Sequence, residues 1–463
     1  MQTSAGTTSP KSSFDPASIR RLHFVARSLS PEGRVSLHYA LDDAEAFTET
    51  FDIPLPAGVV ADEDAVAPLL DLLHWVAGVS YFKMAAPPEV ACETGDPPPA
   101  AATLLEALYS EGLGEFAYEN RERLVHLPRP RFARGPILRA PAARPPQEAT
   151  RVLVPVGGGK DSIVALETVR RTGLDLSLFV VNALDPMRRT AQVAGLPLLE
   201  VRRSLPLDDI RRLNASGALN GHVPITAIVT CVALLTASLN GFDAVALANE
   251  RSASVGNLQH DGIVVNHQFS KSARAEDLLR AAAAEALTDI DVFSLLRPAS
   301  ELLIARTFAR DLNQYHHAFT SCNRNFHIDP AERGGEAWCR NCPKCRFVFL
   351  MLAPFMQPDA LAEIFGGALL EDEAQYEGFA LLTATGGAKP FECVGEEEES
   401  LAAIEMLDAI PGWRDQPLVR RLVAEVLEPA GRSRARIDEF LTFDDGQRVP
   451  TALRDGLRAF LRA

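Results

Sequence analysis

The 463-residue sequence predicts an α/β protein with a parallel sheet, and three observations support that fold class. Strand-like and helix-like segments alternate across residues 151–355, as in a parallel sheet with right-handed crossovers. A glycine-rich turn joins the first of these strands to the first helix. Helical patterns fill residues 356–463, so we expect a helical C-terminal region beside the α/β part.

The N-terminal part is expected to be an α+β domain covering residues 15–126. Three alternating segments predict an antiparallel meander with a first turn at Pro31-Glu32-Gly33, and two later segments have helical apolar spacing. The strands are expected at 22–28, 34–41 and 47–53, and the helices at 62–77 and 104–113. Residues 1–14 are mostly polar and rich in Ser and Thr, which predicts a disordered tail.

A proline-rich segment, residues 127–150, follows this part. Its six prolines cannot sustain a helix or a central strand, so we interpret it as a linker. Beyond it, strands are expected at 152–156, 176–182, 197–202 and 243–248, and helices at 161–172, 206–214, 224–239, 271–287 and 299–312. The acidic run Glu396–Glu399 is interpreted as the solvated start of a later helix.

The glycine turn has the composition of a phosphate-binding loop. The apolar strand ends in Gly157–Gly159, and Lys160-Asp161-Ser162 begins the next helix. Glycines let backbone N–H groups approach an anion, and a helix start adds further donors. A Walker loop is excluded because Val154 stands where its first glycine would be. A dinucleotide fingerprint is excluded because Ser162 replaces its third glycine. An ordinary turn between strand and helix is the remaining alternative.

Four cysteines predict a metal site. Cys339, Cys342 and Cys345 follow one another at knuckle spacing, and Cys322 stands upstream of them. Four thiolates in this arrangement suit tetrahedral zinc, with an iron–sulfur cluster as the rival and His327 as an alternative to Cys322. A closed four-cysteine site would be structural, holding the Cys322–Cys345 loop beside the active cleft without a catalytic water.

Composition limits the partners and the compartment. The formal net charge of −15 argues against a nucleic-acid-binding face, although it permits a local basic pocket. Seven cysteines, three of them within seven residues, suit a reducing compartment. We find no run of 18 apolar residues and no signal core, so we expect a cytoplasmic protein without a membrane segment. The pattern does not define an oligomeric state. Of only six lysines, Lys160, Lys271 and Lys344 fall in motif-bearing segments.

The segment Gly157–Ser162 resembles the PP-loop of the ATP pyrophosphatases, whose pattern is Ser-Gly-Gly-x-Asp-Ser. Gly157 stands where that pattern has serine, so one hydroxyl contact is missing. The resemblance implies an adenine nucleotide α-hydrolase-like domain that splits ATP into AMP and pyrophosphate while adenylating a substrate oxygen. The residues implied to hold the pyrophosphate part of ATP are Gly157, Gly158, Gly159, Lys160, Asp161 and Ser162.

Polar side chains follow the strand expected at 243–248, where the carboxyl edge of a parallel sheet binds ligands. Asn249 and Glu250 are candidates for the nucleotide site, and Glu250 and Asp161 for holding magnesium. Arg251 could bind a carboxylate through two hydrogen bonds. The alternative is an ion pair that caps this loop.

A second polar segment, residues 257–274, is expected to be a loop before a helix and is interpreted as substrate-binding surface. Its candidate side chains are His260, His267, Lys271 and Arg274. His222, just before the helix expected at 224–239, is a candidate substrate contact or simply a capping residue. Arg324 is a further cation for an anionic substrate.

Longer segments carry a closer resemblance. They are Gly221-His222-Val223-Pro224, Asn249-Glu250-Arg251-Ser252-Ala253, Asn266-His267-Gln268-Phe269-Ser270-Lys271, Cys322-Asn323-Arg324-Asn325, and Trp338-Cys339 through Phe349. Together with the meander, the glycine loop and the chain length, they resemble the MurL family, the UDP-N-acetylmuramoyl-L-alanyl-L-glutamate epimerases of peptidoglycan synthesis. The similarity spans nearly the whole chain, from about Phe14.

That resemblance implies ATP- and magnesium-dependent inversion of the terminal L-glutamate of a nucleotide-sugar dipeptide. Adenylating the α-carboxylate removes its charge and makes the α-proton accessible to a base. The acid/base candidates are His260, His267 and Lys271, of which lysine needs a depressed pKa. Cys322 is an alternative catalytic thiol.

Three other functions are weighed against this one. A different carboxylate-adenylating PP-loop enzyme would form an amide or nitrile, like the queuosine-pathway nitrile synthase, whose motifs match the middle domain only. A tRNA-modifying PP-loop enzyme fits poorly with the charge of −15. A nucleotide-sensing or scaffold protein with an idle loop is suggested only by the missing first serine.

Overall fold

A computed structural model gives the architecture of the chain. It describes residues 14–43, 45–137, 150–286, 289–326, 333, 336–383, 385, 389–444 and 448–462. The tail predicted at 1–14 and His327 as a metal ligand fall almost wholly outside the described residues, and half of the linker predicted at 127–150 does so too.

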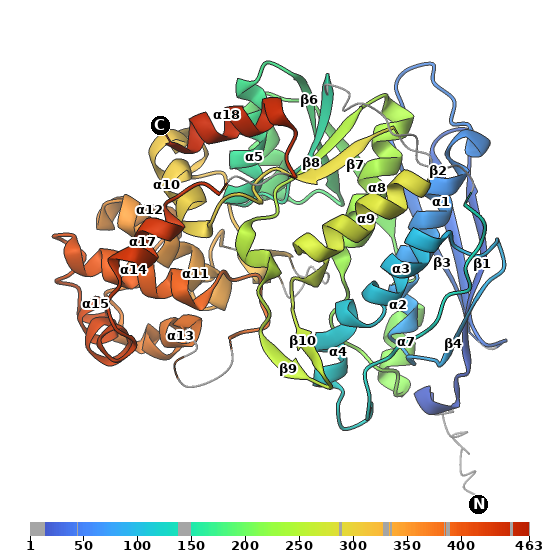
Figure 1. Ribbon diagram of the computed structural model, residues 1–463, viewed down its shortest axis with the longest axis horizontal. Coiled ribbons are helices and arrows are strands. Elements are labelled where there is room, and N and C mark those ends of the chain that lie inside the picture. Colours follow the sequence, from blue (N-terminus) through green and yellow to red (C-terminus); the bar gives the residue numbers. More distant parts are fainter. Residues whose placement is uncertain are drawn as a thin grey trace, which may run out of the picture.

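A nine-stranded sheet runs through the molecule in the order β11-β8-β5-β6-β7-β3-β2-β1-β4 (Figure 1). The strands are β1 (Arg21–Leu29), β2 (Arg34–Leu41), β3 (Glu45–Asp52), β4 (Glu89–Cys92), β5 (Arg151–Pro155), β6 (Asp175–Val181), β7 (Leu198–Ser204), β8 (Ala244–Leu247) and β11 (Asp291–Ser294). From β11 to β7 all neighbours are parallel, and β1–β3 form the expected antiparallel meander. The chain is therefore an α/β protein with a mostly parallel sheet.

The meander and the parallel strands belong to one sheet. Strand β3 pairs antiparallel with β7, opposing Phe51 to Arg203. Across this junction Arg203 Nε donates to Glu49 Oε1 at 2.6 Å, and the Glu49 side chain is fully buried. The division of the chain at residues 127–150 stays a prediction, while hydrogen-bonded strands join the parts on either side of that segment.

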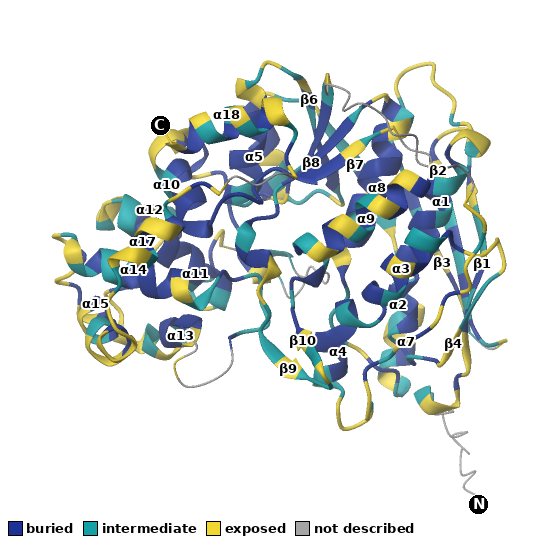
Figure 2. Ribbon diagram, in the orientation of Figure 1, coloured by how far each residue is buried: buried dark blue, intermediate teal, exposed yellow. Residues whose placement is uncertain are grey.

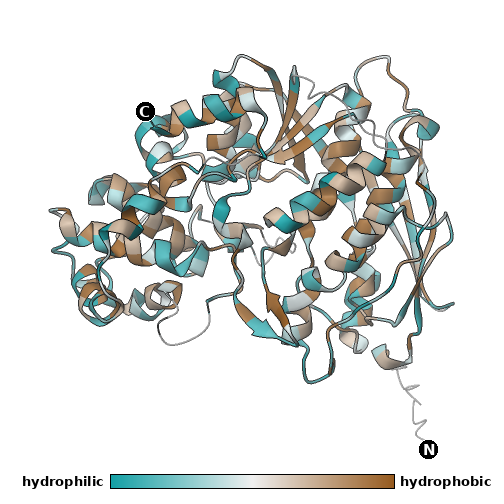
Figure 3. Ribbon diagram, viewed as in Figure 1, coloured by the Kyte–Doolittle hydropathy of each residue, from teal (hydrophilic) through white to brown (hydrophobic). Residues whose placement is uncertain are grey.

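Helices cover both faces of the sheet. In the N-terminal and middle parts they are α1 (Glu63–Ala77), α2 (Val79–Phe82), α3 (Pro99–Leu108), α4 (Gly114–Glu119), α5 (Lys160–Arg171), α6 (Asp185–Ala194), α7 (Leu207–Ser216), α8 (Ile225–Asn240), α9 (Ala273–Glu285) and α10 (Glu301–Asp311). Val152 and Val154 pack into a core with α5 and α10, whereas Leu153 between them packs into a second core with α1 and α8. This alternation is that of a strand buried on both faces. Figures 2 and 3 show these strands as buried and largely hydrophobic.

The C-terminal region is helical, as predicted, and gathers at one end of the molecule, opposite the meander (Figure 1). Its helices are α11 (Pro343–Leu352), α12 (Pro358–Phe365), α13 (Tyr376–Ala380), α14 (Glu397–Ala409), α15 (Pro417–Leu422), α16 (Glu428–Ala430), α17 (Arg434–Phe440) and α18 (Thr451–Arg462). Helix α18 returns to pack on α5 and α10. The interpretation of Glu396–Glu399 as solvated is wrong for Glu399, which is buried and accepts a hydrogen bond from the Glu301 N–H at 2.8 Å.

Among the described residues, one helical stretch, Glu63–Phe82, is long and apolar enough to cross a membrane. Most of it is buried inside the fold, where it packs against α8 and β1. Its apolar character is accounted for by this packing, which is that of a core helix.

Candidate active site

The site begins where the strand order reverses. Strand β5 has β6 on one side and β8 on the other, so the loops that follow β5 and β8 open apart at the carboxyl edge of the sheet. Ligands bind at such switch points in open α/β sheets. The glycine loop follows β5, and Asn249-Glu250 follow β8. The fold thus brings two segments nearly a hundred residues apart to one place.

The three glycines of the loop have different surroundings. Gly158 has φ +81°, and a Cβ added there would lie 3.1 Å from Pro186 Cβ. A Cβ on Gly159 would lie 2.7 Å from Ser321 Oγ. A Cβ on Gly157 would meet nothing within 4 Å. The backbone conformation therefore favours glycine at Gly158, and the Ser321 side chain crowds Gly159, whereas Gly157 borders open space.

The start of α5 is prepared for an anion. Gly159 is its N-cap residue, and no side chain of the described residues caps the helix. The Ser162 hydroxyl donates to the Gly159 carbonyl at 2.9 Å, inside the turn. Uncapped N–H groups at a helix start, with the positive end of the dipole, favour a phosphate or another anion.

Lys160 is buried and points between two carboxylates. Its ammonium donates to Asp161 Oδ1 at 2.5 Å and to Glu301 Oε2. Burial alone would lower the pKa of Lys160, but the two carboxylates raise it above its usual value. Burial raises the pKa of Glu301. The Lys160 ammonium lowers this pKa only in part, and the nearby charge of Asp161 raises it further. Lys160 is therefore a permanent cation at the floor of the site.

A third carboxylate completes this cluster. One oxygen from each of Asp161, Glu250 and Glu301 lies within 4.8 Å of the others, and Glu250 and Glu301 are buried. Carboxylate oxygens are the donors that Mg²⁺ prefers. A divalent ion would also neutralise the negative charges of this cluster more fully than the single ammonium of Lys160 does. The residues therefore fit the magnesium predicted for Asp161 and Glu250, with Glu301 as an added donor.

A second cluster lies around His267, from the 257–274 segment. His267 Nδ1 is 2.5 Å from Glu115 Oε2 of α4, and the ring of His222 lies 4.5 Å from that of His267 between centroids. Burial lowers the pKa of His222 to about 3, helped by the charges of His267 and Lys83. Burial would also lower the pKa of His267, but hydrogen bonds to Cys393 and Glu115 raise it to about 9. His267 is thus cationic and His222 neutral near pH 7.

Cys393 joins the two clusters. Lys271 Nζ lies 3.3 Å from its sulfur, and the charge of Lys271 also acts on Glu250 and Asp161. Burial would lower the pKa of Lys271, but Cys393 and Glu250 raise it. Lys271 is therefore an ammonium, which is the wrong protonation state for the base considered above. Burial would raise the pKa of Cys393, but Lys271, His267 and Lys344 lower it to about 5.

The segment that carries Cys393 comes from the C-terminal part and lies across the 257–274 segment. Asn257 Nδ2 donates to the Pro390 carbonyl at 2.9 Å, and Gln268 Nε2 donates to the Val394 carbonyl at 3.3 Å. Lys344 Nζ donates to the Cys393 carbonyl. Three parts of the chain therefore contribute to one site.

The four predicted cysteines converge. Their sulfur atoms, from Cys322, Cys339, Cys342 and Cys345, all lie within 4.8 Å of one another. The sulfurs of Cys339 and Cys345 are 3.7 Å apart, close to the separation of about 3.8 Å expected around tetrahedral zinc with bonds of about 2.3 Å. Backbone N–H groups of Cys339 and Cys345 also point at sulfurs of the set. The cluster could hold a metal such as zinc.

This cysteine loop is tied to the glycine loop. The Thr320 N–H donates to the Gly158 carbonyl at 2.9 Å, and Ser321 is the residue that crowds Gly159. Cys322 follows directly, and its N–H donates to the Thr320 hydroxyl. The four-cysteine cluster therefore fixes the segment 320–322, and this segment supports the turn between β5 and α5.

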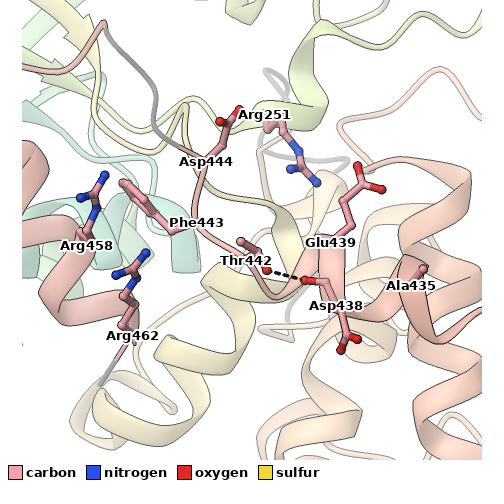
Figure 4. Close-up of a pocket in the computed structure, with 9 residues that line it drawn as sticks. All are labelled: Arg251, Ala435, Asp438, Glu439, Thr442, Phe443, Asp444, Arg458 and Arg462. Carbon is pink, nitrogen blue, oxygen red and sulfur yellow. Dashed lines mark hydrogen bonds between the residues drawn. The ribbon is translucent and has the colours of Figure 1, made fainter.

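Other predicted site residues lie apart from these clusters. His260 ends β9 (Leu258–His260), with its ring edge-on to Tyr118 at 5.3 Å. Arg251 lines an open pocket of about 830 Å³ together with residues of α17 and α18 (Figure 4). Its guanidinium lies over the ring of Phe440. Arg274 is exposed and paired with Glu111 at 2.7 Å.

Two further predicted residues have different surroundings. Asn249 is buried and donates to the Ser294 hydroxyl at 2.9 Å, so its amide also links β8 to β11. Arg324 is exposed on the short helix Asn323–Phe326. These predictions, like that for His260, stay predictions.

Sequence patterns alone did not single out Glu115, Glu301 or Cys393. Glu115 is 152 residues from His267, and Cys393 is 122 residues from Lys271. Glu301 had a signal, because it opens α10 directly after the capping residue Ser300. No comparable local pattern marks Glu115 or Cys393, since their neighbours are set by the tertiary fold.

An α/β fold with an uncapped helix start, buried carboxylates and a cysteine cluster defines the class of protein, an enzyme-like ligand-binding α/β protein. Comparison with known families narrows it. The MurL N-terminal domain matches residues 13–295, and the MurL C-terminal domain matches residues 318–436. The chain belongs to the MurL family.

Three relatives share most of the chain, and each is named UDP-N-acetyl-alpha-D-muramoyl-L-alanyl-L-glutamate epimerase. The protein of Salinispora tropica is 46% identical over 411 residues, covering 87% of this chain and 88% of its own. That of a Micromonospora species is 46% identical over 419 residues, covering 88% and 91%. That of Xanthomonas oryzae pv. oryzae is 39% identical over 458 residues, covering 97% and 99%.

Proposed function

We propose that this protein is an ATP-dependent epimerase that converts the terminal L-glutamate of UDP-N-acetylmuramoyl-L-alanyl-L-glutamate to D-glutamate in peptidoglycan precursor synthesis. Family membership and the names of the three relatives support the substrate and the epimerisation. The observation that carries the ATP-dependent part is the glycine loop before α5, with buried Lys160 and the carboxylates of Asp161, Glu250 and Glu301 beside it.

ATP activates the substrate carboxylate in this proposal. The α-carboxylate oxygen attacks the α-phosphorus of ATP, pyrophosphate leaves, and an acyl-adenylate forms. The N–H groups at the start of α5 and the Lys160 ammonium hold the departing pyrophosphate. The Ser162 hydroxyl donates to the Gly159 carbonyl and therefore lies beside the same N–H groups.

Adenylation answers a specific chemical difficulty. Removing a proton next to a carboxylate would place a second negative charge beside the first, whereas the acyl-adenylate is uncharged there and can accept the electron pair. A side-chain base then removes the α-proton, a proton is delivered to the opposite face, and water cleaves the acyl-adenylate to give AMP. Each tenfold gain in rate at these steps requires about 1.4 kcal/mol of transition-state stabilisation.

Magnesium would be held by Asp161, Glu250 and Glu301, and it would neutralise charge on the phosphates of ATP. Zinc at the four cysteines would be structural, because four protein ligands leave no open position. No predicted step requires a protein or nucleic-acid partner. We also retain the expectation of a cytoplasmic location.

The proposal is tested by incubating the protein with ATP, magnesium and the UDP-muramoyl dipeptide. Pyrophosphate should appear only when the dipeptide is present, together with D-glutamate recovered after hydrolysis. The D-glutamate epimer of the substrate and an unrelated carboxylic acid with ammonia serve as controls. Pyrophosphate without inversion, or with ammonia consumed, would replace the epimerase by the amide- or nitrile-forming alternative.

A further inference from the structure

The thiol of Cys393 is the nucleophile or base in the described site that the proposed chemistry has not yet used. The residue is partly buried, and it lies in the segment that crosses the 257–274 segment. Its sulfur is separate from the four-cysteine cluster. Cys393 therefore differs from the buried Cys231 and from Cys92 at the edge strand, whose pKa values burial raises to about 12.

Three cations from two segments of the chain act on this sulfur. Lys271 Nζ lies 3.3 Å away, His267 is hydrogen-bonded to it, and Lys344 from α11 holds the carbonyl of the same residue. These are the titratable groups that act on it most strongly, and their combined charge lowers the pKa of Cys393 to about 5. A thiolate at neutral pH is the reactive form of cysteine.

The ring of His267 is held in place by Glu115. Glu115 Oε2 lies 2.5 Å from Nδ1, which sets the orientation of the ring and holds its positive charge. A nucleophile or base beside an imidazole that a carboxylate orients is the arrangement by which enzymes keep a thiolate ready. The uncharged His222 ring packs against the ring of His267.

The carboxylate cluster and the thiolate share one lysine. The Lys271 ammonium interacts with Cys393 on one side and with the charges of Glu250 and Asp161 on the other. Lys271 therefore links the sulfur to the carboxylate cluster beside the glycine loop. No other described cysteine stands between the two clusters.

We propose that Cys393 is a catalytic acid/base residue that removes and returns the α-proton on one face of the terminal glutamyl residue. This inference rests on the proposed function. The Cα–H bond breaks, its electron pair moves into the acyl-adenylate as an enolate, and the proton passes to sulfur as S–H. A water molecule on the opposite face gives the enolate a proton. The thiol then gives its proton to the hydroxide so formed, which restores the starting charges. His267 and Lys271 act on Cys393 as positioning residues.

The test separates adenylation from proton removal. Wild-type protein, Cys393→Ser and the control Cys92→Ser are incubated in D₂O with ATP, magnesium and the UDP-muramoyl dipeptide. Pyrophosphate release, deuterium at the glutamyl Cα and D-glutamate are measured together. Cys393→Ser should keep pyrophosphate release within a few-fold of wild type, while deuterium entry and inversion fall about 10²–10⁴-fold. Cys92→Ser should match wild type in all three.

Each result decides between the claims. Deuterium entry at the wild-type rate in Cys393→Ser would overturn the role of Cys393 and leave the epimerase standing. Loss of pyrophosphate release along with exchange would also overturn it, by assigning the thiol to adenylation or to the fold. Wild-type protein that releases no pyrophosphate with this substrate would contradict the proposed function itself, and the inference with it.

A second measurement needs no substrate. The ultraviolet absorbance of thiolate, as the difference between wild type and Cys393→Ser, cancels the signal of the other cysteines. The difference should titrate near pH 5, and His267→Gln should move its midpoint upward. A midpoint at the ordinary value of 9.0 for cysteine, unchanged by His267→Gln, would overturn the proposed ionisation.

Discussion

At the scale of single residues, the site depends on groups whose environment is fixed by one or two neighbours. Gly158 has a backbone conformation that favours glycine, Lys160 neutralises two buried carboxylates, and Cys393 lies among three cations. Composition had singled out Lys160, Lys271 and Lys344 as unusual in a chain that uses arginine for most cations. The structure brings the charges of all three to bear on Asp161, whose pKa they lower against the effect of burial.

The glycines of the loop provide a matched pair of variants. Gly158→Ala should be destabilised by about 1–2 kcal/mol, because φ +81° is unfavourable for alanine and its methyl group would press on Pro186. Gly157→Ala should keep the wild-type stability, since nothing lies within 4 Å of the added carbon. Urea unfolding measures the stability of both variants. Equal stability of the two variants would contradict the assigned loop conformation.

Glu399 predicts a pH dependence of stability. Burial, together with the charges of Glu301 and Glu396, raises its pKa from 4.5 to about 8. The folded protein then holds a proton that the unfolded chain releases above pH 4.5, so stability falls as pH rises from about 4.5 to 8. Glu399→Gln cannot ionise, and its Tm should fall less than that of wild type between pH 5 and pH 8. The exposed neighbour variant Glu398→Gln should keep the wild-type slope, and parallel curves for Glu399→Gln and wild type would refute the assignment.

At the scale of elements, local pattern predicted most of the parallel part. The strands and helices predicted between residues 152 and 312 begin and end within about three residues of their observed bounds. Helix α6 was not among the predicted helices. Strand β11 was not predicted. The 257–274 segment contains a hairpin of three-residue strands, β9 and β10 (Ile263–Val265), where a loop was expected.

Some parts of the site could be predicted from the sequence and others could not. The glycine loop and the cysteine cluster are contiguous or closely spaced, so their patterns are visible in the chain. Glu115 and Cys393 meet His267 only because α4 and the segment after α13 fold over the same edge of the sheet. Pattern and spacing hold no information about contacts of that sequence separation.

The cysteine cluster couples metal binding to the glycine loop. Cys342→Ser should lose most of roughly one zinc ion per chain and lower the Tm, because a three-cysteine set binds the metal less well. Pyrophosphate release should fall as well, since Thr320, next to Ser321 and Cys322, holds the Gly158 carbonyl. Metal analysis, thermal melting and the pyrophosphate assay check these effects on one preparation, with Cys92→Ser as control. Full zinc content and full Tm in Cys342→Ser would rule out the metal site.

At the scale of the whole molecule, one sheet connects the meander to the parallel strands, and the site draws on all parts of the chain. Glu115 lies before the proline-rich segment, Lys160 and His267 lie after it, and Cys393 lies in the C-terminal region. The molecule should therefore fold and act as one unit.

The junction between β3 and β7 tests that unity. Glu49→Gln leaves the Arg203 charge buried without its partner and should cost about 3–5 kcal/mol. Because the sheet is continuous, we expect a single unfolding transition. Its midpoint should move to a lower denaturant concentration whether Trp75, in α1, or Trp413, in the C-terminal region, reports the unfolding. Ser36→Ala, on a partly exposed face of β2, serves as a control. A shift at Trp75 with no shift at Trp413 would show that the two parts unfold separately.

The central claim is that the glycine loop supports transfer of AMP from ATP to the glutamate carboxylate. The most direct measurement uses the UDP-muramoyl dipeptide with ¹⁸O in its α-carboxylate, followed by mass spectrometry of the AMP released. We expect one ¹⁸O atom in AMP for each turnover, because cleavage of the acyl-adenylate by water at the carbonyl leaves the bridging oxygen on phosphorus. Inversion of glutamate with no ¹⁸O in AMP, or with ADP as the product, would contradict the account.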